Sequence, residues 1–227
     1  MSQDLLHGCV PLLADELAQL KAASKARAAP ERILMIERAI ARLRDEGGIE
    51  HRALKEGQLA PDVALPDVSG RRIRLRDRWR NGPLVLVFYR GAWCPYCSLQ
   101  LRAWQRQLDA LRRFGASLVA ISPQTPDHSI TTAQKNALAF TVLSDSALEA
   151  AEAFKIDFTL PPELIDLYGR LGNDLPMLNG NGRWALPMTA TYLIDTRGQI
   201  VYSHVNADYR ERAEPAAVLS RLESMAL

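Results

Sequence analysis

The apolar positions of this chain follow two periods, and their alternation predicts a parallel α/β unit. Residues 84–89 are all apolar and mostly β-branched or aromatic, which is typical of a strand buried on both faces. Apolar side chains then recur at spacings of three and four, which predicts a helix reaching about Phe114; they are Leu101, Trp104, Leu108 and Leu111. Residues 116–122 predict a second buried strand, so the strand–helix–strand unit should be parallel and right-handed.

Shorter patterns fill the chain from residue 57 onward. Strand-like runs on either side of turn residues predict two hairpins. The strands of the first hairpin are residues 60–65 and 72–75, and those of the second are residues 191–195 and 199–202. The remaining patterned segments predict helices over 125–138, 147–154 and 215–225 and a strand over 141–143.

Two further segments are less regular. The basic side chains within residues 71–80 are expected to line the solvated face of a strand. Residues 160–187 are rich in Pro, Gly and Asn, which predicts an irregular insertion with at most one helical turn.

In the first 56 residues the apolar positions have helical spacing without strand-like runs, which predicts a helical extension. Each of two stripes has helical spacing, with Pro30 at the start of the second helix and Gly47 and Gly48 at its end; the stripes are Leu12, Leu13, Leu17 and Leu20, then Ile33, Ile36, Ile40 and Leu43. We therefore divide the chain into a helical extension, residues 1–56, and an α/β domain, residues 57–227. The apolar faces of the two helices need a partner, which is either the α/β domain or a second subunit in a homodimer.

Composition and charge exclude several classes of protein. The 227 residues are 48% hydrophobic and 24% charged, as in an ordinary globular protein. The net charge of +2 gives no electrostatic basis for nucleic-acid binding. No apolar run reaches the roughly 18 residues that a membrane span needs, and the first 20 residues lack the basic and apolar regions of a secretory leader. We expect a cytoplasmic protein that does not bind membranes.

The chemistry is concentrated in Cys94-Pro95-Tyr96-Cys97, between the first buried strand and its helix. Pro95 suits the first position of a helix, and the N–H groups at a helix start favour a thiolate over a thiol. Two intervening residues allow the sulfurs to form a disulfide, which predicts reversible thiol–disulfide chemistry. Zinc needs four ligands, and beyond this pair the chain offers only Cys9 and four unpaired histidines. No metal or cofactor is therefore expected, and Cys9 is expected to be a free thiol in a reducing compartment.

The predicted βαβ unit, Cys turn, terminal hairpin and final helix together describe a thioredoxin-like fold, with a central mixed sheet flanked by helices. Several separated motifs also resemble the alkyl hydroperoxide reductase/thiol-specific antioxidant family, in its peroxiredoxin-like branch. The resemblance covers roughly residues 57–225, and its motifs are Ala60-Pro61-Asp62, 86–97, 119–124, Leu143-Ser144-Asp145 and 191–195.

This resemblance implies a thiol-dependent peroxidase that reduces hydrogen peroxide or organic hydroperoxides. Aligning the loop with the family's Pro-x-x-x-Thr-x-x-Cys motif puts Arg90 at the Pro position, Cys94 at the Thr position and Cys97 at the peroxidatic position. Cys97 would then form a sulfenic acid and Cys94 would condense with it. Thioredoxin, or a glutaredoxin/glutathione system, would supply the electrons.

Two positions depart from the family's pattern. Cys94 is a poorer hydrogen-bond partner than the Thr it replaces, and Thr189 stands where the family carries a supporting Arg. Arg90, Arg102 or Arg183 could take over that supporting role, and Trp93 is expected either to pack over the Cys pair and shape access to it or to be structural.

The same four residues also allow two other interpretations. Read as a thioredoxin or glutaredoxin dithiol, Cys94 is the nucleophile and Cys97 resolves the mixed disulfide, which gives a thiol–disulfide oxidoreductase. The third interpretation is a non-catalytic redox sensor that signals through the helical extension.

Overall fold

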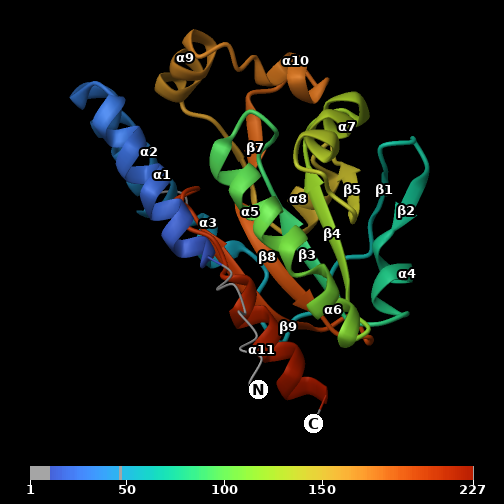
Figure 1. Ribbon diagram of the computed structural model, residues 1–227. Helices are drawn as coiled ribbons and strands as arrows, with labels where there is room; N and C mark the ends of the chain where they lie inside the picture. Colours follow the sequence, from blue (N-terminus) through green and yellow to red (C-terminus); the bar gives the residue numbers. More distant parts are fainter. Residues whose placement is uncertain (1–10, 46–47, 227) are drawn as a thin grey trace, which may run out of the picture.

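The computed structural model describes residues 11–45 and 48–226, so Cys9 lies outside the described residues. At its centre is a five-stranded mixed sheet in the order β5–β4–β3–β8–β9 (Figure 1). The strands are β3 (Leu84–Phe88), β4 (Ser117–Ser122), β5 (Thr141–Ser144), β8 (Thr189–Ile194) and β9 (Ile200–Asn206). β3, β4 and β5 run parallel, while β8 pairs antiparallel with both β3 and β9. The predicted parallel unit and C-terminal hairpin are confirmed.

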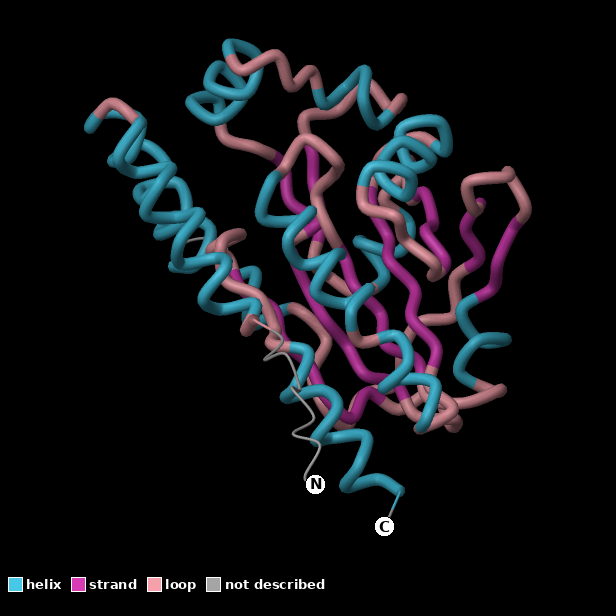
Figure 2. Tube along the Cα trace, in the orientation of Figure 1, coloured by secondary structure: helices cyan, strands magenta, loops and turns pink. Residues whose placement is uncertain are grey.

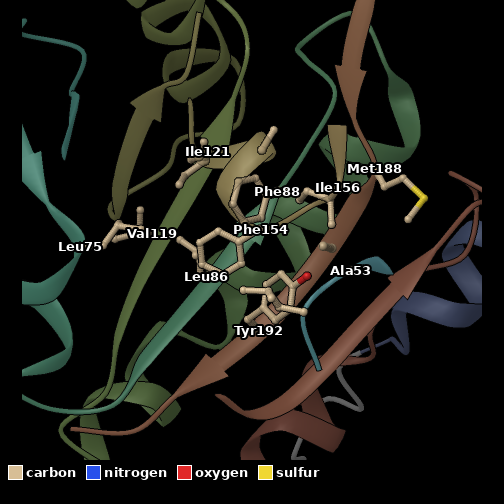
Figure 3. Close-up of a cluster of buried hydrophobic side chains, with 14 of the residues drawn as sticks. Ala53, Leu75, Leu86, Phe88, Val119, Ile121, Phe154, Ile156, Met188 and Tyr192 are labelled. Atoms are coloured by element: carbon tan, nitrogen blue, oxygen red, sulfur yellow. The ribbon is translucent and has the colours of Figure 1, made fainter. Parts of the chain in front are cut away.

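β3 is buried on both faces, as its uninterrupted apolar run predicts. Leu86 and Phe88 join a cluster on one face with Phe154 and Tyr192, whose aromatic rings lie close together (Figure 3). The ring centroids of Phe88 and Phe154 are 5.1 Å apart. Val85 and neighbouring Val87 join a different cluster on the opposite face, because successive strand side chains point to opposite sides.

Helices cover both faces of this sheet (Figure 2). The face that carries Val85 is covered by α5 (Pro95–Arg106), α6 (Leu108–Arg113) and α11 (Pro215–Ala226). The opposite face carries α8 (Glu149–Ala153), and α7 (Pro126–Lys135) contacts β5. The single helix predicted up to Phe114 is wrong in one respect, because Gln107 leaves the helical conformation, with φ −103° and ψ 4°, and divides α5 from α6.

A small hairpin and one helical turn precede the sheet. β1 (Ala64–Pro66) and β2 (Arg72–Arg74) pair antiparallel, as predicted. The prediction of a strand through residue 80 is wrong, because the chain forms α4 (Leu75–Trp79) directly after β2. Leu75 and Trp79 are both buried in the same cluster, because residues four apart lie on one face of a helix.

The prediction of an irregular insertion over 160–187 is also wrong. The segment contains α9 (Pro162–Arg170) and α10 (Leu175–Asn179), and its end forms β7 (Ala185–Pro187), which pairs with β6 (Asp157–Thr159). Pro162 and Pro176 lie in the first turns of these helices, where proline starts a helix rather than breaking it. Leu164 and Tyr168 at a spacing of four bury one face of α9. Both helices lie at the end of the sheet where α5 begins (Figure 1).

The N-terminal residues form α1 (Leu13–Arg27) and α2 (Pro30–Asp45), followed by the short α3 (Ile49–Arg52), and this pair of long helices packs on the α/β domain. Leu13 and Leu17 of α1 are buried in a cluster that contains residues of α5. Ala39 of α2 is buried with Leu164 and Tyr168 of α9. The apolar faces therefore contact the same chain, whereas the boundary after residue 56 and the homodimer remain predictions.

Polar contacts fix the position of this helical pair. The carboxylate of Glu214 accepts hydrogen bonds from the N–H groups of Leu13 (3.3 Å) and Ala14 (3.1 Å) at the start of α1. Arg210 forms a bidentate pair with Glu37 of α2 at 2.9 and 3.0 Å. The Nε of Arg210 also donates to the carboxylate of Asp208 at 2.7 Å. Bidentate, partly buried pairs of this kind fix orientation as well as contributing energy.

Within the described ranges 11–45 and 48–226, no helix is both long and apolar enough to cross a membrane.

Candidate active site

Cys94 and Cys97 lie at the start of α5, as the sequence predicts. Cys94 is the residue that caps the helix, and Pro95 is its first residue. The N–H of Cys97 donates to the carbonyl of Cys94 at 3.0 Å, so Cys97 lies within the first turn. The partial positive charge of a helix start favours a thiolate there.

The loop that carries the pair from β3 is held by a glycine and a buried glutamine. Gly91 has φ +147°, and a Cβ at this position would lie 2.5 Å from Nε1 of Trp93. The Oε1 of Gln124, which follows β4, accepts a hydrogen bond from the N–H of Ala92 at 2.7 Å. The loop therefore needs both a residue without a side chain and a partner from the neighbouring strand.

Cys97 is fully buried, and its sulfur accepts hydrogen bonds from two sides. The backbone N–H of Arg90 lies 3.4 Å from Cys97 Sγ, and Nη2 of Arg212 lies 3.5 Å from it. The thiol of Cys94 is a third hydrogen-bonding partner. A sulfur surrounded by donors and by a guanidinium charge is placed to hold negative charge.

Arg212 is itself oriented by a buried polar network. Its Nε donates to Oε1 of Gln100 at 2.9 Å, and its Nη1 donates to Oγ1 of Thr189 at 3.1 Å. Nη1 also donates to the carbonyl oxygens of Tyr209 and, at 3.0 Å, Glu211. Thr189 is thus brought to the site, where it positions a guanidinium.

The two thiols have opposite electrostatic environments. Burial raises the pKa of Cys94, and its hydrogen bond to Cys97 and the negative charge on Cys97 raise that pKa further. Burial would also raise the pKa of Cys97, but the Cys94 hydrogen bond and the charges of Arg212 and Arg90 outweigh it and hold that pKa well below the ordinary thiol value. Because adjacent buried thiols do not both ionise readily, Cys97 is the sulfur of the pair whose surroundings favour the thiolate.

Arg90 and Trp93 also belong to the site. The Arg90 guanidinium lies 4.1 Å from the ring centroid of Tyr209, 4.7 Å from that of Trp93 and 5.3 Å from that of Tyr168. It donates to the Tyr168 hydroxyl. Trp93 packs edge-on against Tyr168, with ring centroids 5.4 Å apart. Trp93 therefore packs beside Arg90 at the entrance to the Cys loop.

Two of the three arginines considered from sequence lie elsewhere. Arg102 donates to Asn136, the residue that caps the end of α7, at 3.0 Å, and Arg183 donates to the carbonyl of Ala147 at 2.7 Å. Sequence reasoning missed Arg212, which is 115 residues from Cys97. No local pattern marks Arg212, because its role depends on the fold bringing the segment between β9 and α11 against α5 and the start of β8.

The described part of the chain, residues 11–45 and 48–226, contains no group of three or more His, Cys, Asp or Glu side chains that could hold a metal ion.

Comparison with known proteins identifies the family. Residues 57–203 match the model of the AhpC/TSA family. The chain is 32% identical over 103 residues to peroxiredoxin Bcp of Escherichia coli K12, a match that covers 45% of this chain and 65% of that protein. It is 26% identical over 153 residues to chloroplastic peroxiredoxin Q of Populus jackii, covering 66% of this chain and 61% of that protein. The match thus spans less than two thirds of these relatives.

Solved structures show the same fold. Peroxidoxin BcpB of Mycobacterium tuberculosis superposes with a TM-score of 0.60 at 22% identity, covering 76% of this chain and 98% of that chain. Peroxiredoxin Q of Xanthomonas campestris gives a TM-score of 0.56 at 21% identity, covering 78% of this chain and 99% of that chain. The predicted α/β, thioredoxin-like fold is confirmed. The chain belongs to the AhpC/TSA family, as its motifs predicted.

Proposed function

We propose that this protein is a thiol-dependent peroxidase that reduces hydrogen peroxide or organic hydroperoxides, with Cys97 as the nucleophile. The observation that carries the proposal is the convergence of three donors on one sulfur. Arg212 Nη2, the N–H of Arg90 and the Cys94 thiol all face Cys97. Membership of the AhpC/TSA family supports this class of reaction.

The proposed cycle uses both sulfurs. The Cys97 thiolate attacks one peroxide oxygen, the O–O bond breaks, and the other oxygen leaves as water or an alcohol after it takes up a proton. Cys97 is left as a sulfenic acid. The Cys94 thiol then attacks the Cys97 sulfur, water leaves and a disulfide forms. Arg212, hydrogen-bonded to the thiolate, is placed to stabilise charge on the oxygen that develops beside it.

The dithiol oxidoreductase interpretation requires Cys94 to attack first. Both sulfurs are buried, but burial and the hydrogen bond to Cys97 raise the pKa of Cys94, whereas the surroundings of Cys97 lower its pKa. Since the thiolate is the attacking species, these properties favour Cys97 as the first nucleophile and Cys94 as the resolving residue.

The rest of the cycle follows from the sequence predictions. We propose that thioredoxin or a glutaredoxin/glutathione system reduces the disulfide, that the protein works in the cytoplasm, and that it forms a homodimer. No metal or cofactor takes part in the proposed cycle.

Single-turnover oxidation tests the assignment of roles. In a Cys9→Ser background, the reduced Cys94→Ser and Cys97→Ser variants are mixed with hydrogen peroxide or an organic hydroperoxide, and thiol loss is followed over time. We expect Cys94→Ser to react at nearly the parental rate and to accumulate a sulfenic acid that a dimedone label captures. Cys97→Ser should react no faster than a free cysteine.

Three results would contradict this assignment. If Cys97→Ser reacts as fast as its parent, Cys94 attacks first. If no variant exceeds the rate of free cysteine while the parent reduces a mixed disulfide, the protein is a thiol–disulfide oxidoreductase. Oxidation that changes the oligomeric state but is never reversed by any reductant would indicate a sensor.

A further inference from the structure

A cavity of about 180 Å³ lies beside Cys94, between the α1–α2 pair, α9 and the start of α5. Cys94 lines this cavity and Cys97 does not. Aromatic and aliphatic side chains form part of the wall, among them Trp93, Ile36 and Leu167. The cavity is therefore an approach to one sulfur of the pair.

Among the described residues, the charged groups that line the cavity are all cationic. They are Lys21, Lys25, Arg32, Arg90 and Arg210. Three carboxylates just outside the lining balance part of this charge: Glu211 and Asp208 lie 3.1 and 3.7 Å from Lys21, and Glu37 lies 3.8 Å from Lys25. Arg210 shares Asp208 and Glu37. Within the described part of the chain, five cations against three carboxylates leave an excess of positive charge.

That excess resides on Arg32 and Arg90. Arg32 is exposed on α2, and its guanidinium has no ion pair within the described residues. Arg90 is 4% exposed and surrounded by aromatic rings rather than carboxylates. Its Nε has no hydrogen-bond partner in the described part of the chain. A buried donor without a partner, next to an open volume, points to a ligand with acceptor oxygens.

The size of the opening limits what can reach Cys94. Its sulfur lies under α1, whose Leu13 and Leu17 are buried in the same cluster as Cys94 and Tyr96. With Cys94 only 2% exposed, the active-site loop of another protein cannot reach its sulfur while α1 and α2 stay docked. A small molecule can enter through the cavity.

We propose that this cavity binds a small, negatively charged thiol, the class that glutathione represents, and that this thiol reduces the Cys94–Cys97 disulfide by attacking Cys94. The proposal rests on the disulfide of the proposed function and narrows its reductant from a protein to a small anionic thiol.

The step is balanced with two thiols. The first thiolate attacks Cys94 Sγ, the Cys94–Cys97 bond breaks, and Cys97 leaves as a thiolate. A second thiolate then attacks the sulfur of the first thiol, and the bond between that sulfur and Cys94 breaks. The two small thiols leave as a symmetrical disulfide, and Cys94 takes up a proton. Two thiols thus supply two electrons. Attack at Cys94 has the better leaving group, because a thiol of lower pKa leaves faster and Arg212 stabilises the departing Cys97.

The experiment measures reduction separately from peroxidase activity. The Cys9→Ser protein is oxidised with diamide, so the disulfide forms whether or not the protein reacts with peroxide. Its reduction is then timed with glutathione, neutral 2-mercaptoethanol and cationic cysteamine. Each rate constant is divided by that of the same thiol with a small exposed disulfide, which removes differences in intrinsic reactivity.

Arg32→Glu is the test variant, and Arg38→Glu is its matched control. Arg38 is exposed on the same helix and does not line the cavity, so both variants change the net charge equally. At low salt we expect the normalised rate constant of reduction by glutathione to be about tenfold higher than that of reduction by cysteamine. Arg32→Glu should slow reduction of the disulfide by glutathione about fivefold, and less at high salt. Arg38→Glu should not change the rate of that reduction. Mass spectrometry of Cys97→Ser treated with oxidised glutathione should find the adduct on Cys94.

Three results would overturn the inference. Equal normalised rates for glutathione and cysteamine would show that the cavity does not select charge. Rapid reduction by thioredoxin, with glutathione unaffected by Arg32→Glu, would identify a protein reductant. If Arg32→Glu slows oxidation by a carboxylated hydroperoxide but not reduction by glutathione, the cavity serves the peroxide. The single-turnover oxidation of the reduced protein tests the peroxidase activity separately, so a failure of the proposed function would be seen there and not in these reduction experiments.

Discussion

Replacing Arg212 tests most directly how this site holds a thiolate. Its Nη2 lies 3.5 Å from Cys97 Sγ, and two unit charges about 4 Å apart interact by about 4 kcal/mol at an effective dielectric constant of about 20. Since about 1.36 kcal/mol corresponds to a tenfold change in rate, this value sets a ceiling of about 10³-fold. The Arg90 N–H and the Cys94 thiol still contact the sulfur in Arg212→Gln. We therefore expect oxidation by hydrogen peroxide to slow about 10²-fold.

The assay is a stopped-flow measurement of the second-order rate constant between reduced protein and hydrogen peroxide across a range of pH. In parallel, the ultraviolet absorbance of the thiolate follows ionisation of Cys97. Arg212→Gln should raise the pKa of Cys97, because it removes a cation from beside the thiolate. Arg212→Lys keeps the charge without the fork of donors, and should recover part of the rate.

Arg102→Gln is the matched control, because Arg102 lies on α5 but donates to Asn136 rather than to the sulfur. Circular dichroism and urea unfolding identify variants that fail to fold. If folded Arg212→Gln reacts within about threefold of the parent and titrates at the same pH, the guanidinium does not stabilise the thiolate and the reasoning is wrong.

Three further perturbations follow from the same geometry. Thr189→Val removes the hydroxyl that accepts from Arg212 at 3.1 Å; the stopped-flow rate should fall about threefold to tenfold and urea unfolding should show a loss of about 1–2 kcal/mol. Because its surroundings hold the pKa of Cys97 well below the ordinary thiol value, the rate constant should fall with decreasing pH, as the thiolate is protonated, at a lower pH than the rate constant of free cysteine does. Gly91→Ala places a Cβ 2.5 Å from the Trp93 indole nitrogen at φ +147°, and should lower the free energy of unfolding by about 1–3 kcal/mol and shift the tryptophan fluorescence.

Each of these predictions has a contradicting result. An unchanged rate in Thr189→Val would mean that Gln100 and the backbone carbonyls of Tyr209 and Glu211 are sufficient to orient the guanidinium. A rate constant that falls at the same pH as that of free cysteine would mean that the surroundings of Cys97 do not lower its pKa. Gly57→Ala is the control for the glycine, because it also has positive φ but nothing lies within 4 Å of its added Cβ; equal fluorescence changes in the two variants would exclude the clash.

The site departs from the peroxiredoxin pattern in its residues while meeting the same chemical requirements. The motif alignment predicts Thr189 at the position where the family carries its Arg, and Thr189 accepts a hydrogen bond from Arg212, which comes from the segment after β9. Cys94, at the Thr position of the family's loop, is a hydrogen-bonding partner of Cys97. The thiolate therefore keeps a cation and a side-chain donor, although neither comes from the residue that the family's motif predicts.

The helical extension is part of this site rather than a separate module. Leu17 of α1 is buried in the same cluster as both cysteines, and Glu37 of α2 is held by Arg210. Because the extension lies over the Cys loop, its docking determines which molecules can contact Cys94. This arrangement accounts for the restriction of the cavity to small molecules.

The sequence by itself determined the framework of this protein. The apolar run of β3, the helical spacing in α5 and the Cys-Pro-Tyr-Cys turn between them are local patterns, and local patterns follow the fixed periods of strand and helix. They were sufficient to place Cys94 and Cys97 at a helix start and to predict the fold class. Local patterns predict the segment 160–187 less well, because proline is common in irregular structure but Pro162 and Pro176 start helices there.

Only the tertiary structure decided which charges meet the sulfurs and what can reach them. Arg212 contacts Cys97 across 115 residues, and α1 and α2 cover Cys94 from the other end of the chain. Such contacts depend on how distant segments cross in space, and no spacing along the chain records them. Because electrostatic stabilisation falls with distance and rises with burial, the difference between the two cysteines became visible only when the folded chain placed Arg212 beside one of them.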